Sequence, residues 1–444
     1  MLTVTRPTLA NGYYSPYQIV GPPEDAAPMP TGGETLRSAL GGYADSTSTP
    51  WDAFQSFTGR TLWYKSVYAS NANIMSWSGI RTNLQNLLNS SLFPGNGGMV
   101  LAVHMAPKLS GQALPDVAVG TFNKSHFNGV GTDIENSGVL DTPRPDGRPN
   151  LLFYPGWEIN GSGYFSFQPS TLADFGLYAQ MADLVIGWIL ESISVEKRDR
   201  LRFVYGLRWR HRNNPDALAM LEAGFAGSYD DLDSSVYDAH ANYKNKTQAQ
   251  KDTAEDGVWD LILDGDQGLA AIYSLLTSRP DAMFCLCETG IQTELGDVAD
   301  DAGGGDHPVF WGRLSDWVAA NPEADDRLRF FGYTQTDSAG GGTFQNKLGP
   351  RKAATLDAGT DFLTSAAHGY AANTPVCVYG STQPSDLTRE VVYYVRNQTT
   401  NTYQLSATSG GAPIDLSDTG EDVMVFSGNF PKTASRFWQR VGES

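Results

Sequence analysis

Short apolar runs alternate with amphipathic segments along most of the chain. Compact apolar runs that end in polar or small residues lie at 61–69, 98–104, 151–154, 202–209 and 282–288. Runs of this length are typical of strands that are buried on both faces of a parallel sheet. Segments such as 76–92 and 172–194 instead repeat their apolar residues at the spacing of a helix. The pattern therefore predicts alternating strands and helices.

Eight strands can be placed in this way. We expect strands at 35–43, 61–69, 98–104, 151–154, 202–209, 234–241, 282–288 and 327–334, and helices at 49–59, 76–92, 172–194, 216–225, 256–278 and 307–320. Eight such strands favour a closed parallel barrel, the (β/α)8 or TIM-barrel class of α/β folds, over an open sheet. Residues 108–148 show no period and are rich in Gly, Pro and Asn. We expect them to form a long loop, as a lid or an insertion.

The pattern changes after residue 352. Residues 353–428 lose the helical period and carry short runs rich in Val, Thr and Tyr between turn residues, which predicts a small all-β module. Because a barrel of residues 34–352 still lacks its last helix, we expect the module to be inserted and a helix within 429–444 to complete the barrel. A linker followed by a tail is the alternative. Residues 1–33, rich in Pro, Gly and Tyr, predict an N-terminal arm.

Charge and cysteine content narrow the classes of partner. The 444 residues carry a formal net charge of −18, which repels phosphate backbones and anionic lipid, so we expect neither nucleic acid nor membrane as a partner. The first residues lack the basic-then-apolar pattern of an export signal. Of the three cysteines, Cys285, Cys287 and Cys377, the first two lie in an apolar run and are interpreted as buried small apolar residues. We expect no disulfide framework, no cofactor and no metal site. The acidic, Gly-rich loop 297–306 lacks the EF-hand spacing for Ca²⁺, which favours a solvated loop.

Chemistry in such a barrel gathers at the carboxyl ends of the strands. Glu158 and Glu288 each follow an apolar strand, the predicted fourth and seventh. We expect Phe284, Leu286 and Glu288 to alternate inward, which places the two carboxylates on opposite walls of one pocket. Taken alone, Glu158 is equally well explained as the cap of the following helix. The other side chains expected to line the pocket are His104, Trp157, Asn160, Arg208, Trp209, Tyr237, His240 and Tyr333.

Two facing carboxylates are the arrangement that glycosidic bond cleavage requires. One carboxyl protonates the leaving oxygen, and the other attacks the anomeric carbon or activates water. Aromatic residues make up 11% of the chain, and flat rings beside amide groups are typical of a carbohydrate cleft. A large aromatic core explains that content equally well.

The segment Tyr154-Pro-Gly-Trp-Glu-Ile-Asn-Gly161 resembles the acid/base strand of glycoside hydrolase family 26, which consists mostly of retaining β-mannanases. Cys287-Glu-Thr-Gly290 resembles the nucleophile strand of that family. The resemblance implies that Glu158 is the general acid/base and Glu288 the nucleophile. Members of that family usually have a His directly before the acid, where this chain has Trp157. They usually have a Trp on the eighth strand, near the position of Tyr333 in this chain. His240 occupies the place of a Tyr that contacts the nucleophile, with Tyr237 and Tyr243 as substitutes.

The predicted β module has a resemblance of its own. Residues 363–369, 393–397 and 403–408 resemble a small β repeat of bacteriophage tail and virion-associated proteins. The resemblance implies a virion location, other tail proteins as partners, and a homo-oligomer or a larger assembly. Together the two resemblances imply an endo-acting retaining glycoside hydrolase that cleaves a host cell-surface polysaccharide. A barrel that grips glycan without cleaving it, and a purely structural tail protein, are the alternatives.

Overall fold

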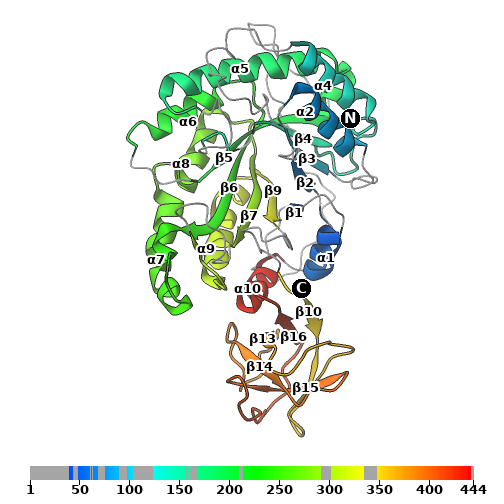
Figure 1. Ribbon diagram of the computed structural model, residues 1–444, viewed down its shortest axis with the longest axis vertical. Coiled ribbons are helices and arrows are strands. Elements are labelled where there is room, and N and C mark those ends of the chain that lie inside the picture. The colour runs from blue at the N-terminus through cyan, green and yellow to red at the C-terminus, as the bar shows by residue number, and fades with distance from the viewer. Residues whose placement is uncertain are drawn as a thin grey trace.

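The computed structural model describes residues 40–43, 49–60, 62, 64–68, 76–89, 98–103, 124–156, 158–160, 169–209, 214–291, 302–334 and 348–441. Eight strands of this part pair in parallel, each with its neighbour in the chain, and the last pairs with the first. They are β1 (Leu40–Tyr43), β2 (Tyr64–Tyr68), β3 (Gly98–Val103), β4 (Leu151–Pro155), β5 (Leu201–Arg208), β6 (Asp231–His240), β7 (Phe284–Ile291) and β9 (Leu328–Thr334). The ring closes without an edge, which confirms the predicted TIM-barrel class (Figure 1).

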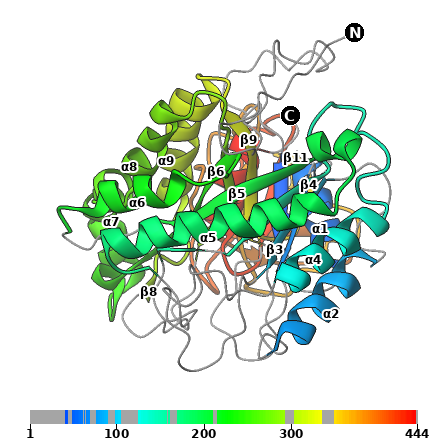
Figure 2. The same ribbon diagram turned by 90° about the horizontal axis from the view of Figure 1, so that it is seen from above.

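Helices cover the outside of this barrel (Figure 2). They are α1 (Thr49–Thr58), α2 (Trp77–Leu88), α4 (Lys124–Asn136), α5 (Leu172–Glu191), α6 (Ala217–Phe225), α7 (Gln248–Asp264), α8 (Leu269–Ser274) and α9 (Pro308–Val318). Local sequence fixes several of the helix starts. Thr171 and Thr247 each form a reciprocal capping box with the third residue of their helix, Asp174 and Gln250. No helix in the described part of the chain is long and apolar enough to cross a membrane.

Three sequence expectations about these elements were wrong. The predicted loop 108–148 contains α4, whose buried Phe127, Val130 and Ile134 pack on the barrel side; several glycines had hidden its period. The helix expected at 256–278 starts earlier and breaks between Gly265 and Gly268 into α7 and α8. Strand β6 begins at Asp231 rather than at residue 234. Its true start was missed because acidic residues are unusual in a buried strand.

Side chains fill the barrel on both faces of its sheet. Between sheet and helices lies the large apolar core, to which every second strand residue contributes. The interior holds a smaller group made up of Tyr64, Val100, Ala102, Leu152, Tyr154, Val204, Cys285, Cys287 and Phe330. Both faces carry apolar side chains, which is why most of the strands read as continuous apolar runs. Strand β6, with its buried acidic residues, is the exception.

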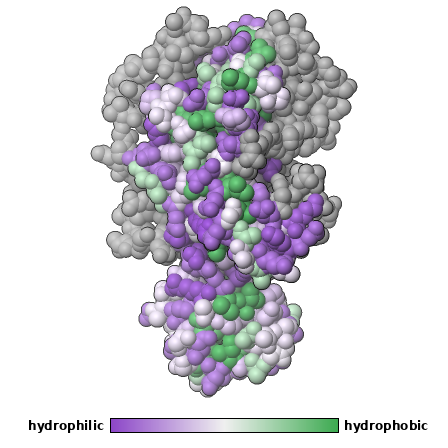
Figure 3. Space-filling model, turned by 90° about the vertical axis from the view of Figure 1, so that its left-hand side faces the viewer, coloured by the Kyte–Doolittle hydropathy of each residue, from purple (hydrophilic) through white to green (hydrophobic). Residues whose placement is uncertain are grey.

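The antiparallel module follows β9. Its strands are β10 (Arg351–Ala353), β11 (Thr355–Asp357), β12 (Phe362–Thr364), β13 (Pro375–Tyr379), β14 (Tyr393–Arg396), β15 (Thr402–Ser406) and β16 (Met424–Ser427). Its first and last strands pair, with Arg351 opposite Phe426, so the chain enters and leaves at one place. The module forms a separate lobe with its own apolar core and a surface of mixed hydropathy (Figure 3).

Helix α10 (Pro431–Val441) returns from the module to the barrel. The ring of Phe437 lies 4.7 Å from that of Trp311 on α9, 5.0 Å from that of Tyr333 on β9 and 5.7 Å from that of Phe54 on α1. The helix thus fills the position after the eighth strand. The chain has a β module inserted before its last barrel helix.

Candidate functional site

Glu158 stands just beyond β4, in an unusual backbone conformation. Its φ is 42°, and that of Gly156 is 86°. A left-handed non-glycine residue is uncommon and marks a segment that its surroundings hold in place. The amide of Ile159 donates a hydrogen bond to the carbonyl of Gly206 on β5 (3.0 Å). Glu158 is 5% exposed, and its Oε2 lies 3.7 Å from Nη1 of Arg208. The turn therefore aims a nearly buried carboxylate at the end of β5.

Asn160 holds this turn against β5. Its Nδ2 donates to the carbonyl of Arg208 (2.6 Å), and its Oδ1 accepts from the amide of Arg208 (2.8 Å). Nδ2 also donates to Oε1 of Gln267 (2.9 Å). Asn160 is buried, and its side chain is occupied by these bonds. The sequence placed Asn160 among the substrate-contacting residues, but in the structure it positions Glu158 and Arg208.

Glu288 reaches the inner face of the barrel through a β-bulge. Between Leu286 and Thr289, β7 has one residue more than β9, and the same excess appears opposite β6. Cys285 and Cys287 lie in the barrel interior, whereas Phe284 and Leu286 pack toward the helices. The expected inward alternation of Phe284, Leu286 and Glu288 was therefore wrong.

The bulge turns the side chain of Glu288 to the inner face of the barrel, whereas simple alternation along β7 would turn it outward. Thr289 pairs with Tyr333 and with Val236, and both of those side chains face the helices. Paired residues of parallel strands share a face, so Thr289 faces outward and the preceding Glu288 faces inward. Glu288 is 5% exposed. Bulges of this kind are common beside active sites, where they redirect one side chain.

A third carboxyl, Asp233, is affected by the charge of Glu158 and contacts the residue before Glu288. It lies on the inner face of β6 and is buried. Its Oδ1 accepts a hydrogen bond from the amide of Cys287 (2.8 Å) and its Oδ2 one from the thiol of Cys287 (2.9 Å). Burial, together with the negative charge of Glu158, raises the pKa of Asp233 to about 7. The inner mouth of the barrel thus holds three carboxyl groups from β4, β6 and β7.

Sequence reasoning missed Asp233. The available signal was an acidic residue inside an apolar strand, two positions before Ser235 and four before Tyr237. Strand alternation puts all three on one face. Tyr237 therefore lies on the inner face, beside Gly290 of β7, and its contact with substrate stays a prediction.

Aromatic groups from β5 and β6 lie together beyond these carboxyls. The ring of Trp209 lies 6.3 Å from that of His240, with 24° between the planes. Nε1 of Trp209 donates to the carbonyl of Tyr237 (3.2 Å), and Nδ1 of His240 accepts from the amide of Asn242 (3.1 Å). Trp209 and His240 thus meet beyond the ends of β5 and β6. Trp209 is buried and belongs to the core between sheet and helices, so its predicted contact with substrate stays a prediction.

Two predicted substrate-binding tyrosines lie elsewhere. Tyr333 is fully buried in the core between β9 and the helices, against Trp311 and Phe437. Tyr243 is also fully buried, and its hydroxyl donates to Oε2 of Glu255 (3.0 Å). Neither side chain reaches the barrel mouth, so both predictions were wrong. His104 and Trp157 lie outside the described residues.

Comparison with known proteins gives a likeness of fold only. No protein-family model and no curated protein matches the chain. A mannanase, man26, of Bacillus subtilis is 14% identical over 70% of this chain and 81% of its own, with a TM-score of 0.39. A GH26 β-mannanase from Bacteroides ovatus is 14% identical over 70% of this chain and 84% of its own, with a TM-score of 0.39. A GH53 catalytic domain from Ignisphaera aggregans is 13% identical over 74% of this chain and 92% of its own, with a TM-score of 0.40. Likenesses this distant assign no activity, and the barrel assignment rests on the strand pairing of this chain.

Proposed function

We propose that this chain is an endo-acting retaining glycoside hydrolase. The observation that carries the proposal is the pair Glu158 and Glu288, each nearly buried and each brought to the barrel mouth by a specific backbone device. A left-handed turn positions the first, and a one-residue bulge positions the second. In this mechanism Glu158 protonates the leaving oxygen and Glu288 attacks the anomeric carbon. Glu158 then acts as base toward the water that releases the product.

The neighbouring groups have roles that fit this cycle. Arg208 lies 3.7 Å from Glu158 and contacts the ionised form that must accept a proton from water. Asp233 holds the amide of Cys287 and so fixes the bulge that directs Glu288. Tyr237, on the inner face of β6 beside Gly290, supplies a ring and a polar edge for a sugar. The resemblance of the β4 and β7 segments to family 26 supports the same assignment of roles.

We infer the substrate and setting from the module. Its resemblance to phage tail repeats supports a host cell-surface polysaccharide as substrate and a place among tail proteins of a virion. A barrel that binds glycan without cleaving it is the second candidate. One observation favours it: Asn160, Tyr243 and Tyr333 are engaged in internal contacts, which leaves fewer groups for substrate.

The test uses the full chain and purified bacterial capsular and cell-wall polysaccharides, with plant β-mannan and β-glucan for comparison. Mass analysis of the products is expected to show internal cleavage, and NMR of the first product is expected to show retained anomeric configuration. Glu158→Gln is expected to lose the activity, whereas Glu196→Gln, on the exposed surface, is expected to keep it. Binding to a polysaccharide without any cleavage supports the second candidate. An inverted first product rules out Glu288 as nucleophile.

A further inference from the structure

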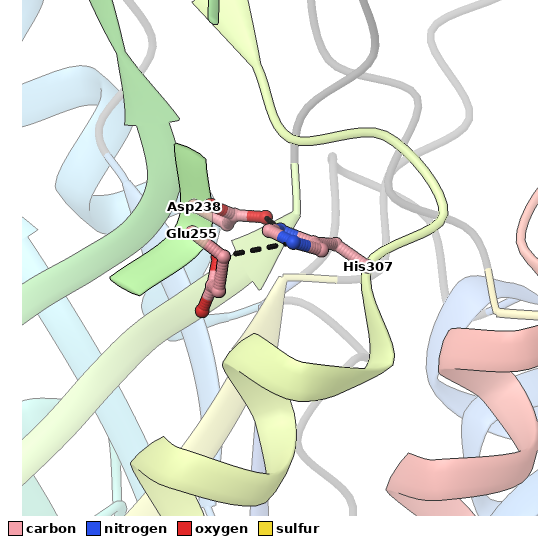
Figure 4. A group of neighbouring side chains, drawn as sticks. All are labelled: Asp238, Glu255 and His307. Atoms are coloured by element: carbon pink, nitrogen blue, oxygen red, sulfur yellow. Dashed lines mark hydrogen bonds and ion pairs between the residues drawn. The ribbon is translucent and has the colours of Figure 1, made fainter. Parts of the chain in front are cut away.

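Three ionisable side chains meet on the outer side of the barrel, away from the proposed catalytic carboxyls. Asp238 comes from the end of β6, Glu255 from the middle of α7, and His307 from the residue before α9 (Figure 4). They are 0%, 3% and 1% exposed. One potential ligand atom from each lies within 4.8 Å of the others. No motif in the sequence indicates this group, because its members are 17 and 52 residues apart.

The imidazole of His307 is held on one side and faces a carboxylate on the other. Its Nδ1 lies 2.7 Å from Oδ2 of Asp238, in a hydrogen bond. Its Nε2 lies 3.0 Å from Oε2 of Glu255, yet this nitrogen has no hydrogen-bond partner. The two atoms are close but misaligned for a hydrogen bond. Oε1 of Glu255 and Oδ1 of Asp238 are likewise buried without a hydrogen-bond partner.

We propose that Nε2 of His307 and the carboxylate of Glu255 bind a divalent transition-metal ion, with zinc as the preferred ion. Two ligands placed about 2.1 Å from one zinc ion at roughly 90–110° are themselves about 3.0–3.4 Å apart, which matches the 3.0 Å separation of Nε2 and Oε2. The mixture of imidazole and carboxylate suits zinc, whereas Ca²⁺ takes oxygen ligands alone.

The surrounding residues complete the site. Asp238 fixes the ring through Nδ1, in the carboxylate–histidine–metal arrangement that orients the metal-binding nitrogen. The hydroxyl of Tyr243 donates to Oε2 of Glu255 and orients that carboxylate. Asp252 has Oδ1 3.9 Å from Nε2, and its side chain is 45% exposed. It supplies a third ligand and the route by which the ion enters.

Bound metal would connect three elements that are distant in the chain. Strand β6 carries Asp238, α7 carries both acidic ligands, and His307 lies directly before α9. The same end of β6 carries His240 of the candidate cleft. The ion would therefore fix the end of β6 relative to α7 and α9, without taking part in the chemistry. This inference does not depend on the proposed hydrolase activity.

Zinc binding to the full chain tests the proposal. After dialysis against EDTA, titration calorimetry with Zn²⁺ is expected to show one site per chain with a Kd in the micromolar range or below, and Ca²⁺ is expected to show none. Glu255→Gln and His307→Gln are expected to weaken zinc binding at least tenfold. Asp256→Asn, on the exposed surface of the same helix, is the matched control and is expected to bind as the wild type does. Cobalt in place of zinc is expected to give visible absorption bands that disappear in His307→Gln.

The alternative is a closed ion-pair network with no room for an ion. The guanidinium of Arg313, on α9, lies close enough to act on Glu255 and would help to neutralise such a network. Absence of zinc binding to the wild-type chain, or equal binding by wild type and both Gln variants, overturns the proposal. Circular dichroism of each variant separates lost binding from lost folding.

Discussion

Asp233 accepts hydrogen bonds from both the amide and the thiol of Cys287, the residue directly before Glu288. A buried carboxyl on β6 thereby holds the bulge of β7 that turns Glu288 toward the barrel mouth. Simple alternation along β7 would turn Glu288 outward, on the same face as Leu286. The bulge that this contact holds turns Glu288 to the inner face instead. It also makes Asp233 the residue through which the backbone of β7 and the charge of Glu158 interact.

Replacing Asp233 by Asn is expected to change the pH dependence of stability. The folded-state pKa of Asp233 is raised to about 7, so its protonated form favours folding. That contribution is complete below about pH 4 and is lost as the pH rises toward 7, on the order of 4 kcal/mol in total. Asp233→Asn does not ionise, and it keeps an oxygen for the Cys287 amide. The difference between the melting temperatures of Asp233→Asn and the wild type is therefore expected to shift in favour of the variant as the pH rises from 4 to 8. A difference that stays constant with pH contradicts the raised pKa of Asp233.

Asn160→Ala is expected to remove the clamp between β4 and β5. Three hydrogen bonds are lost, and a part-buried amide and carbonyl of Arg208 lose their partner, which is expected to reduce stability by about 2–4 kcal/mol. Because the turn also carries Glu158, any hydrolysis rate is expected to fall more in kcat than in KM. Denaturant unfolding and steady-state kinetics measure the two effects. Unchanged stability would contradict the clamp.

The buried carboxylate of Asp231, at the start of β6, is expected to be essential to the stability of the barrel. It lies 2.8 Å from Nη2 of Arg202 and 2.6 Å from Nε of Arg329. Burial raises its pKa, but these two guanidinium groups outweigh burial and bring the pKa to about 2. Asp231→Asn leaves two buried cations and is expected to lose about 3–5 kcal/mol.

The same ion cluster predicts an acid response of the wild-type chain. Because the folded-state pKa of Asp231 is lowered, its stabilisation is present above about pH 4 and is lost as the pH falls toward 2. Urea unfolding between pH 5 and pH 2.5 measures this loss. Asp231→Asn is expected to lack this part of the acid response; an identical acid slope in the two proteins contradicts the assignment.

Phe437→Ala tests whether α10 completes the barrel. The ring is fully buried among Trp311, Tyr333 and Phe54, and its removal is expected to lower the free energy of unfolding by about 3–5 kcal/mol. Gln439→Ala, half-buried on the same helix, is the control and is expected to lose less than about 1 kcal/mol. Similar losses in the two variants would indicate that α10 is only loosely attached.

The sequence predicted the barrel because its signal is local and repeated. Each apolar strand lies between polar turns, and the change of pattern at residue 353 marked the module. The helix α4 was missed because its glycines weaken the apolar period, and the break between α7 and α8 was missed because the apolar stripe runs through it.

The candidate site was harder to predict because it depends on contacts between distant residues. Glu158 and Glu288 were visible as strand-end carboxylates, but the bulge that turns Glu288 inward appears only in strand register. Tyr333 looked like a cleft residue until its partners on α9 and α10 were known. The group Asp238, Glu255 and His307 has no sequence pattern, since three separate elements supply it.

The most direct test of the account is the rate at which the full chain releases reducing ends from a cell-surface polysaccharide, before and after Glu288→Ala. Loss of the nucleophile is expected to lower this rate by at least about 10³-fold, with the fold intact by circular dichroism. Azide is expected to restore cleavage by occupying the space of the missing carboxylate and attacking the sugar in its place. A rate that Glu288→Ala leaves unchanged would contradict the assignment of Glu288 as the nucleophile of a hydrolase.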